Sequence, residues 1–140
     1  MANDTTSRGR KRAQAGQSLT ELPIALVLFL ALTFGIVDAG RLIYAYNAVS
    51  LSAREGVRWA AVRGGTSVHA ASKADIQDFV QSKTVGIPVT VDVSWLPDGN
   101  NQPGSTVVVT VTTAFAPIAP LPLVPKTINL TSTSRMVISR

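Results

Sequence analysis

A stretch of 16 uncharged and mostly apolar residues, Leu22 to Val37, most constrains what this chain can fold into. At the rise of an α-helix it spans about 24 Å, somewhat less than the ~30 Å hydrocarbon core of a bilayer. Flanking side chains and local thinning of the bilayer can make up the difference. Glu21 stands directly before the stretch, and an acid inside a membrane is costly. The sequence therefore predicts a membrane-embedded helix at about residues 22–37, with a functional acid at its N-terminal end.

The positive charge of the chain is concentrated before this stretch. The formal net charge is +5. Basic residues next to a membrane span stay in the cytoplasm, and anionic lipid headgroups attract them there. Without its first 16 residues the chain would keep nine basic and seven acidic residues. The charge therefore predicts a single-pass inner-membrane protein with a cytoplasmic N-terminus, and no nucleic-acid partner. The charged residues among the first 16 are Asp4, Arg8, Arg10, Lys11 and Arg12.

The helical pattern continues beyond the apolar stretch. Small and apolar residues recur every three or four positions and form one narrow stripe, which suits close packing against a sheet or another helix. Gly64-Gly65 is expected to end the helix. Pro23 is expected to mark its start, or to kink the helix if it begins earlier. A helix from about Ser18 to Arg63 would be about 69 Å long, more than a small globule can bury. The stripe consists of Leu42, Ala45, Val49, Ala53, Gly56 and Ala60.

The second half of the chain predicts one short helix and three strands. The helix is expected between Ser67 and Thr84, with Ser72 or Ser67 at its N-cap. Alternating and β-branched residues predict antiparallel strands, with one face toward a helix and one toward water. The expected strands are Val89 to Trp95, Thr106 to Phe115 and Lys126 to Ser139.

These elements predict an α+β fold class. A long N-terminal membrane-embedded helix would pack, through its outer half, on a small antiparallel β-sheet with one extra short helix. Three segments are expected along the chain. They are a basic cytoplasmic leader (1–16), a long helix (17–63) and an extracytoplasmic α+β domain (64–140).

Residues that could carry catalysis or hold a metal are few. The chain has no cysteine and one histidine, His69, which excludes thiolate sites, a histidine-based triad and a multi-histidine metal cluster. No glycine-rich phosphate loop followed by Lys-Ser or Lys-Thr occurs. Asp92, Asp98 and the two asparagines after Gly99 offer oxygen atoms of the kind that Ca²⁺ prefers, but the sequence from Asp98 to Asn101 is first a turn. We expect no enzymatic activity, no catalytic residue, no cofactor and no metal site.

The residues around the start of the apolar stretch resemble a known class. Gly16, followed by Glu21 and an apolar helix, resembles the prepilin processing site of type IV filaments. The order of motifs over residues 16–62 is similar to that of TadE-like proteins, the minor pilins or pseudopilins of tight-adherence (Flp-type) pili. Leu22 stands where Flp major pilins carry tyrosine, and the chain is longer than a major subunit. Both differences favour an accessory role. The matching motifs are Gly16-Gln17-Ser18-Leu19-Thr20-Glu21, 34–46 and 53–60.

The resemblance implies sites and partners. A prepilin peptidase would cut between Gly16 and Gln17, and Glu21 would attract the N-terminal amine of a neighbouring subunit. The other implied partners are pilin or pseudopilin subunits, the inner-membrane assembly platform and the lipid bilayer, with possible placement in a surface pilus. From their i, i+3 spacing, Asp38 and Arg41 can pair at the outer membrane edge.

Three alternatives stay open at this point. The apolar helix could be an uncleaved anchor for an extracytoplasmic binding or adhesion domain. It could also be a signal peptide removed at Val37-Asp38-Ala39, which loosely resembles a cleavage site. Glu21 could interact with the helix macrodipole alone, without any partner. The N-terminal residue of the mature protein separates the first two alternatives from pilin processing. An uncleaved anchor predicts an intact or Met-trimmed start, a removed signal peptide predicts a start at Gly40, and pilin processing predicts a start at Gln17.

Overall fold

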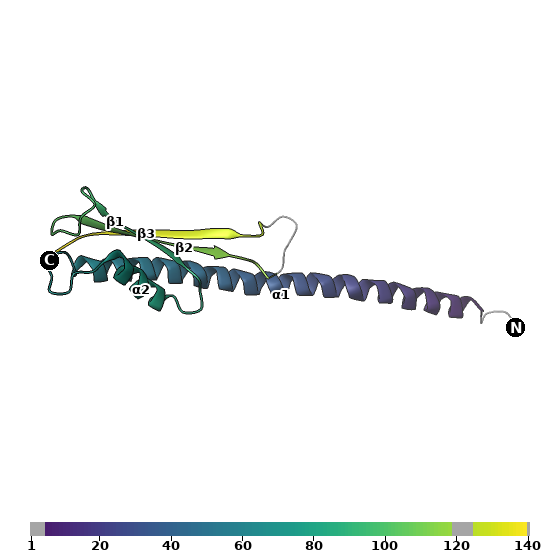
Figure 1. Ribbon diagram of the computed structural model, residues 1–140. Helices are drawn as coiled ribbons and strands as arrows, with labels where there is room; N and C mark the ends of the chain where they lie inside the picture. Colours follow the sequence, from purple (N-terminus) through teal and green to yellow (C-terminus); the bar gives the residue numbers. More distant parts are fainter. Residues whose placement is uncertain (1–4, 119–124, 140) are drawn as a thin grey trace. The chain divides into compact units, whose positions relative to one another are not determined.

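The computed structural model describes residues 5–118 and 125–139, with side chains described from Glu21 onward. The chain divides into two compact units, residues 1–39 and 40–140, and one helix contributes to both (Figure 1). The elements are α1 (Thr5–Ala61), α2 (Lys73–Lys83), β1 (Thr90–Leu96), β2 (Thr106–Phe115) and β3 (Ile128–Val137).

In unit 1 the described residues all belong to α1. This helix begins at Thr5, earlier than expected, and Pro23 lies inside it. The prediction that Pro23 marks the helix start is therefore wrong. The residues before it are rich in arginine, lysine, alanine and glutamine, which have high helix propensity. They continue the helix on the N-terminal side although proline removes one backbone hydrogen bond.

Unit 2 contains a three-stranded antiparallel sheet in the order β1-β2-β3. Val93 pairs with Val109, which pairs on its other side with Ser134. The bounds of β2 are those expected from the sequence, while β1 and β3 differ from their expected bounds by one or two residues. The short helix α2 begins at Lys73, with Ser72 as its N-cap, so the alternative cap at Ser67 is wrong.

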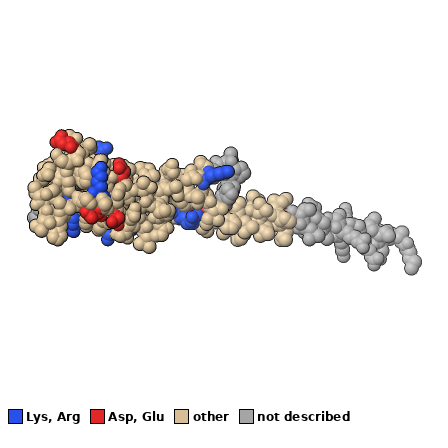
Figure 2. All heavy atoms as spheres, viewed as in Figure 1, with Lys and Arg blue, Asp and Glu red and all other residues tan. Residues whose placement is uncertain are grey.

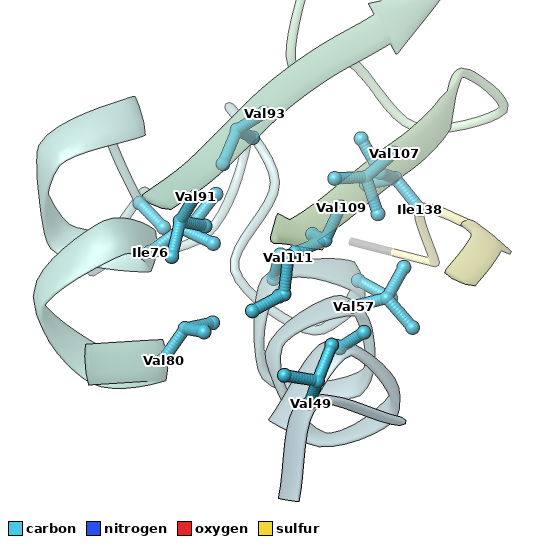
Figure 3. Close-up of a cluster of buried hydrophobic side chains, with 14 residues drawn as sticks. Val49, Val57, Ile76, Val80, Val91, Val93, Val107, Val109, Val111 and Ile138 are labelled. Atoms are coloured by element: carbon cyan, nitrogen blue, oxygen red, sulfur yellow. The ribbon is translucent and has the colours of Figure 1, made fainter. Parts of the chain in front are cut away.

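The core of unit 2 lies between the inner face of the sheet and the two helices (Figure 3). Every residue of the predicted stripe on α1 is buried except Leu42, which is half-buried. The inner face of β3 is less covered than that of β1 and β2, and Met136 is 40% exposed. The labelled core residues are Val49, Val57, Ile76, Val80, Val91, Val93, Val107, Val109, Val111 and Ile138.

The end of α1 differs from the expectation. The helix stops at Ala61, and neither Gly64 nor Gly65 has the positive φ of a glycine helix stop. Instead, Gly65 allows a close approach, because its N–H donates to the carbonyl of Asn101 and a Cβ would lie 2.7 Å from that oxygen. The C-terminal tail also meets this helix end, where the backbone N–H of Ser139 donates to Ala61 at 3.0 Å.

The outer face of the sheet is polar. Threonine side chains on β2 and β3 form cross-strand hydrogen bonds, with 3.0 Å between the hydroxyls of Thr110 and Thr133 and 3.2 Å between those of Thr112 and Thr131. This division into a packed and a solvated face is typical of antiparallel sheets. The long apolar helix, short second helix and three-stranded antiparallel sheet form an α+β pilin-like fold, as the sequence predicts.

Candidate membrane and assembly site

The junction that opens the apolar stretch lies on α1. The backbone at Gly16 and Gln17 is helical, and the side chain of Gln17 lies outside the described part. Glu21 is the first described side chain, and it is exposed. A carboxylate in this position is accessible to a partner.

The apolar stretch of α1 is uncovered by the rest of the protein. From Leu22 to Val37 every described residue is exposed except Ala31, which is half-buried. Phe29 and Leu32, for example, are 64% and 66% exposed. The helix is long and apolar enough to cross a membrane. Because the core helix of a soluble protein is mostly buried, this exposure indicates a membrane-spanning helix or a signal sequence instead.

From Glu21 onward, charged side chains are confined to unit 2 and to the two ends of this stretch. Figure 2 shows Lys, Arg, Asp and Glu over unit 2, with only uncharged residues along α1 between Glu21 and Asp38. The one hydroxyl in the stretch, that of Thr33, donates to the carbonyl of Phe29 at 2.8 Å, so its hydrogen bond is made within the helix, as a lipid environment requires. The distribution is consistent with a single-pass membrane anchor followed by a unit with a charged surface.

The residues at the far end of the stretch lie in different surroundings. Asp38 is half-buried and Arg41 is exposed. The guanidinium of Arg41 lies 5.2 Å from the ring centroid of Phe115, a cation–π contact. The pairing of Asp38 with Arg41 stays a prediction.

The C-terminal half of α1 carries the other feature that the sequence suggested. Gly56 faces α2 and β2, and a Cβ at this position would overlap the side chain of Val80. The small residues of the stripe thus allow α1 to approach both the sheet and α2. This is the close packing predicted from the stripe.

A cluster of aromatic and basic side chains bridges α1 and α2. The rings of Trp59 and Phe79 stack with centroids 5.0 Å apart and an interplanar angle of 17°. Arg63 lies 4.1 Å from the Trp59 centroid, and Lys83 lies 5.3 Å from the Phe79 centroid. Since both rings also pack against the core, the cluster stabilises the contact between the two helices.

The polar residues considered for catalysis or metal binding have structural surroundings. His69 is exposed, and its backbone N–H donates to Ser67 Oγ at 3.1 Å. Asn101 Nδ2 donates to the carbonyls of Arg63 and Ala71 at 3.2 and 2.9 Å. Over residues 21–118 and 125–139, whose side chains the structure describes, no three His, Asp or Glu side chains come together as a metal-binding group.

Sequence reasoning missed the role of Asn101. Its amide joins the end of α1 to the segment before α2, although these residues are 30 and 38 positions away. Asn101 lies in a run of turn-forming residues, and such a run indicates only a loop. No signal in the sequence identifies the carbonyls to which its amide donates.

The junction, the apolar stretch and the packed half of α1 together match one family model. Residues 16–58 match the model described as TadE-like protein. The N-terminal segment is TadE-like. The match confirms the resemblance over these residues, and the family suggests a Tad (Flp-type) pilus-associated protein. No curated protein and no solved structure matches the chain.

Proposed function

We propose that this TadE-like protein is a pseudopilin or minor pilin that takes part in assembly of a tight-adherence (Flp-type) type IV pilus. One observation carries the proposal: the TadE-like segment joins Gly16 and Glu21 to an apolar helix that the protein itself leaves uncovered. Such a helix needs lipid around it before assembly and neighbouring subunits around it afterwards. Its partners are other pilin or pseudopilin subunits and the inner-membrane assembly platform.

The proposed maturation step is cleavage by a prepilin peptidase between Gly16 and Gln17. The bond lies before the apolar stretch, on the side where the basic leader holds the chain at the cytoplasmic face. Glycine has no side chain that could clash in the peptidase. Cleavage removes the leader (1–16) and gives Gln17 a free amine.

The proposed role of Glu21 is to pair with that amine on a neighbouring subunit. Glu21 is exposed, and the low dielectric of the membrane strengthens attraction between opposite charges. The competing explanation is local, because an acid near a helix N-terminus gains about 0.3 to 1 kcal/mol from the macrodipole without a partner.

A Glu21→Gln variant separates the two roles, because it removes the charge and keeps the shape. If the pair forms, processed and membrane-inserted variant protein enters pili, or co-purifies with pilus components, at a sharply lower level than wild type. Unit 2 should stay folded, since its core contains no residue of unit 1. Wild-type incorporation of the variant would contradict the intersubunit pair and leave the macrodipole explanation.

The proposed location is the inner membrane, with the N-terminus in the cytoplasm and unit 2 outside. A reporter that is active only outside the cytoplasm, fused after Arg140, should be active. A stable but inactive fusion would reverse the orientation. In the proposed orientation Asp38 and Arg41 lie at the outer edge of the membrane, where their opposite charges can pair. A charge-swapped double variant that inserts better than either single variant would support this pair.

A further inference from the structure

Apolar side chains gather at the end of unit 2 where α1 enters it. Three segments meet there: the first residues of α1 in this unit, the loop after α2, and the end of β2 with the residues after it. We call this surface the base and define it as residues 41–46, 84–88 and 113–118. A hollow of about 280 Å³ lies between the segments, lined by Arg41, Tyr44, Ala45, Gly86, Ile87, Pro88, Thr113, Ala114, Phe115 and Ala116.

Several large apolar side chains of the base face outward. Val85 is 77% exposed, Ile43 61%, Tyr44 60%, Tyr46 56% and Ile118 55%. Single exposed apolar residues are common on protein surfaces, but groups of them mark sites of contact with a partner or a membrane. The base is such a group.

The outward position of Val85 is fixed by hydrogen bonds on both sides. The backbone N–H of Thr84 donates to Gln81 at 3.2 Å, and that of Ile87 donates to Thr84 at 3.3 Å. Gly86 takes a φ of 77°, which favours glycine. On the far side of the loop, Thr113 Oγ1 donates to the carbonyl of Pro88 at 2.7 Å. The exposed valine is therefore part of a turn whose conformation is fixed by hydrogen bonds.

The α1 residues of the base follow the apolar stretch closely in the sequence. Arg41 and Tyr44 follow Val37 by four and seven residues, or about 6 and 11 Å along a helix. Each headgroup layer adds roughly 5 to 8 Å to the hydrocarbon core. The apolar stretch is about 6 Å shorter than that core, and such a mismatch draws flanking residues toward the lipid. The loop and strand segments of the base line the same hollow as Arg41 and Tyr44.

The chemistry of the base suits a lipid surface. Tyrosine rings are enriched at the level of the headgroups, and basic residues are attracted to anionic lipids. The base contains Arg41 and no aspartate or glutamate. Lys126 is at the same end of the sheet, because it precedes Ile128, which pairs with Phe115. The acidic residues of unit 2 all belong to other parts of it.

We propose that the base of unit 2 lies in the headgroup layer of the outer leaflet, with Val85 and Tyr44 entering the interface. The inference rests on the proposed membrane span of α1. It adds a second, peripheral contact with the membrane, which the subunit must give up when it leaves the membrane for a filament.

The absence of cysteine in the chain allows a direct test with single-cysteine variants. Nitroxide labels are placed at Val85→Cys in the base, at Val68→Cys and at Phe29→Cys. Val68 is a matched control, since it is also a loop valine and is 96% exposed. It lies after the end of α1, about 30 Å along the helix from Arg41. The full-length protein is reconstituted in vesicles of phosphatidylethanolamine and phosphatidylglycerol, and collisions with oxygen and with a water-soluble nickel chelate are measured.

We predict a different result at each labelled position. The label at Phe29 collides with oxygen and not with nickel, and the label at Val68 collides freely with nickel. The label at Val85 shows nickel collisions reduced several-fold relative to Val68, with oxygen collisions retained. Equal nickel access at Val85 and Val68, with Phe29 in lipid, would overturn the base contact and leave the span intact. Protection of Val85 from both reagents would indicate a protein neighbour and also overturn it. Nickel access at Phe29 would refute the span itself.

Discussion

Gly56 on α1 lies against Val80 on α2 so closely that a Cβ at position 56 would overlap Cγ2 of Val80. Both residues belong to the packed interior of unit 2, and Val80 is fully buried. The absence of a side chain at position 56 therefore sets the distance between the two helices. Alanine at position 56 would be expected to make the isolated helix more stable and the folded unit 2 less stable.

Gly56→Ala should destabilise unit 2 by about 1 to 3 kcal/mol, the usual cost of overpacking. Unfolding of the detergent-solubilised protein, followed by near-UV circular dichroism, measures this loss. Gly40→Ala is the control, because a Cβ there meets nothing within 4 Å and alanine favours the helix. Adding Val80→Ala to Gly56→Ala should recover part of the stability. A double variant less stable than the sum of the two single changes would contradict the packing account.

Asn101→Asp should also destabilise unit 2. The change removes the two amide hydrogen bonds to Arg63 and Ala71 and places a carboxylate against their carbonyl oxygens. A buried group left without its partner costs about 1 to 3 kcal/mol. Asn129→Asp makes the same change at an exposed site on β3 and should have little effect. Equal unfolding midpoints in urea for both variants would mean that the Asn101 amide does not hold the two segments together.

The N-terminus of α2 should give unit 2 a stability that depends on pH. Hydrogen bonds from the side chain and then the backbone N–H of Ser72 lower the pKa of Asp75 below its usual value. Because the folded-state pKa is the lower one, the stabilisation is present above the unfolded pKa of about 4. It is lost as the pH falls through the folded value.

The difference in stability between wild type and Asp75→Asn should therefore be largest above about pH 4 and shrink at lower pH. Unfolding midpoints measured from pH 6 to pH 2 show this change. Asp78→Asn, an exposed acid on the same helix, is the control and should show no such trend. A wild-type advantage that stays constant down to pH 2 would mean that the Ser72 cap does not depend on the Asp75 charge.

The features that the sequence predicted are those encoded by neighbouring residues. The spacing of Ala45, Val49 and Ala53 indicates the buried face of α1, and the alternation of Val91 and Val93 indicates the inner face of β1. The cap at Ser72 has a local signature as well, since Asp75 stands three residues later. These patterns are repeated within a few residues, so no tertiary information is needed to find them.

The features that the sequence did not predict depend on contacts between distant residues or on competing conformational preferences of neighbouring residues. Pro23 suggested a helix start, but the helix-forming residues before it continue α1. Gly65 suggested a helix stop, whereas its actual role is the close approach of Asn101. The exposure of Val85, 77%, could not be predicted, because the local sequence does not set the direction of a side chain in a turn. Only the fold decides which side of the turn faces outward.

The central claim is that α1 is the membrane segment of a processed pilin-class subunit, and the mass of the mature N-terminus tests it most directly. The measurement is intact-protein mass spectrometry of protein made in cells with a prepilin peptidase. We predict that wild type begins at Gln17 and that Gly16→Val keeps the 16 leader residues. Ala15→Val, which leaves Gly16 in place, should mature like wild type. A wild-type chain that is intact or begins at Gly40, or a Gly16→Val protein that matures normally, would contradict the account.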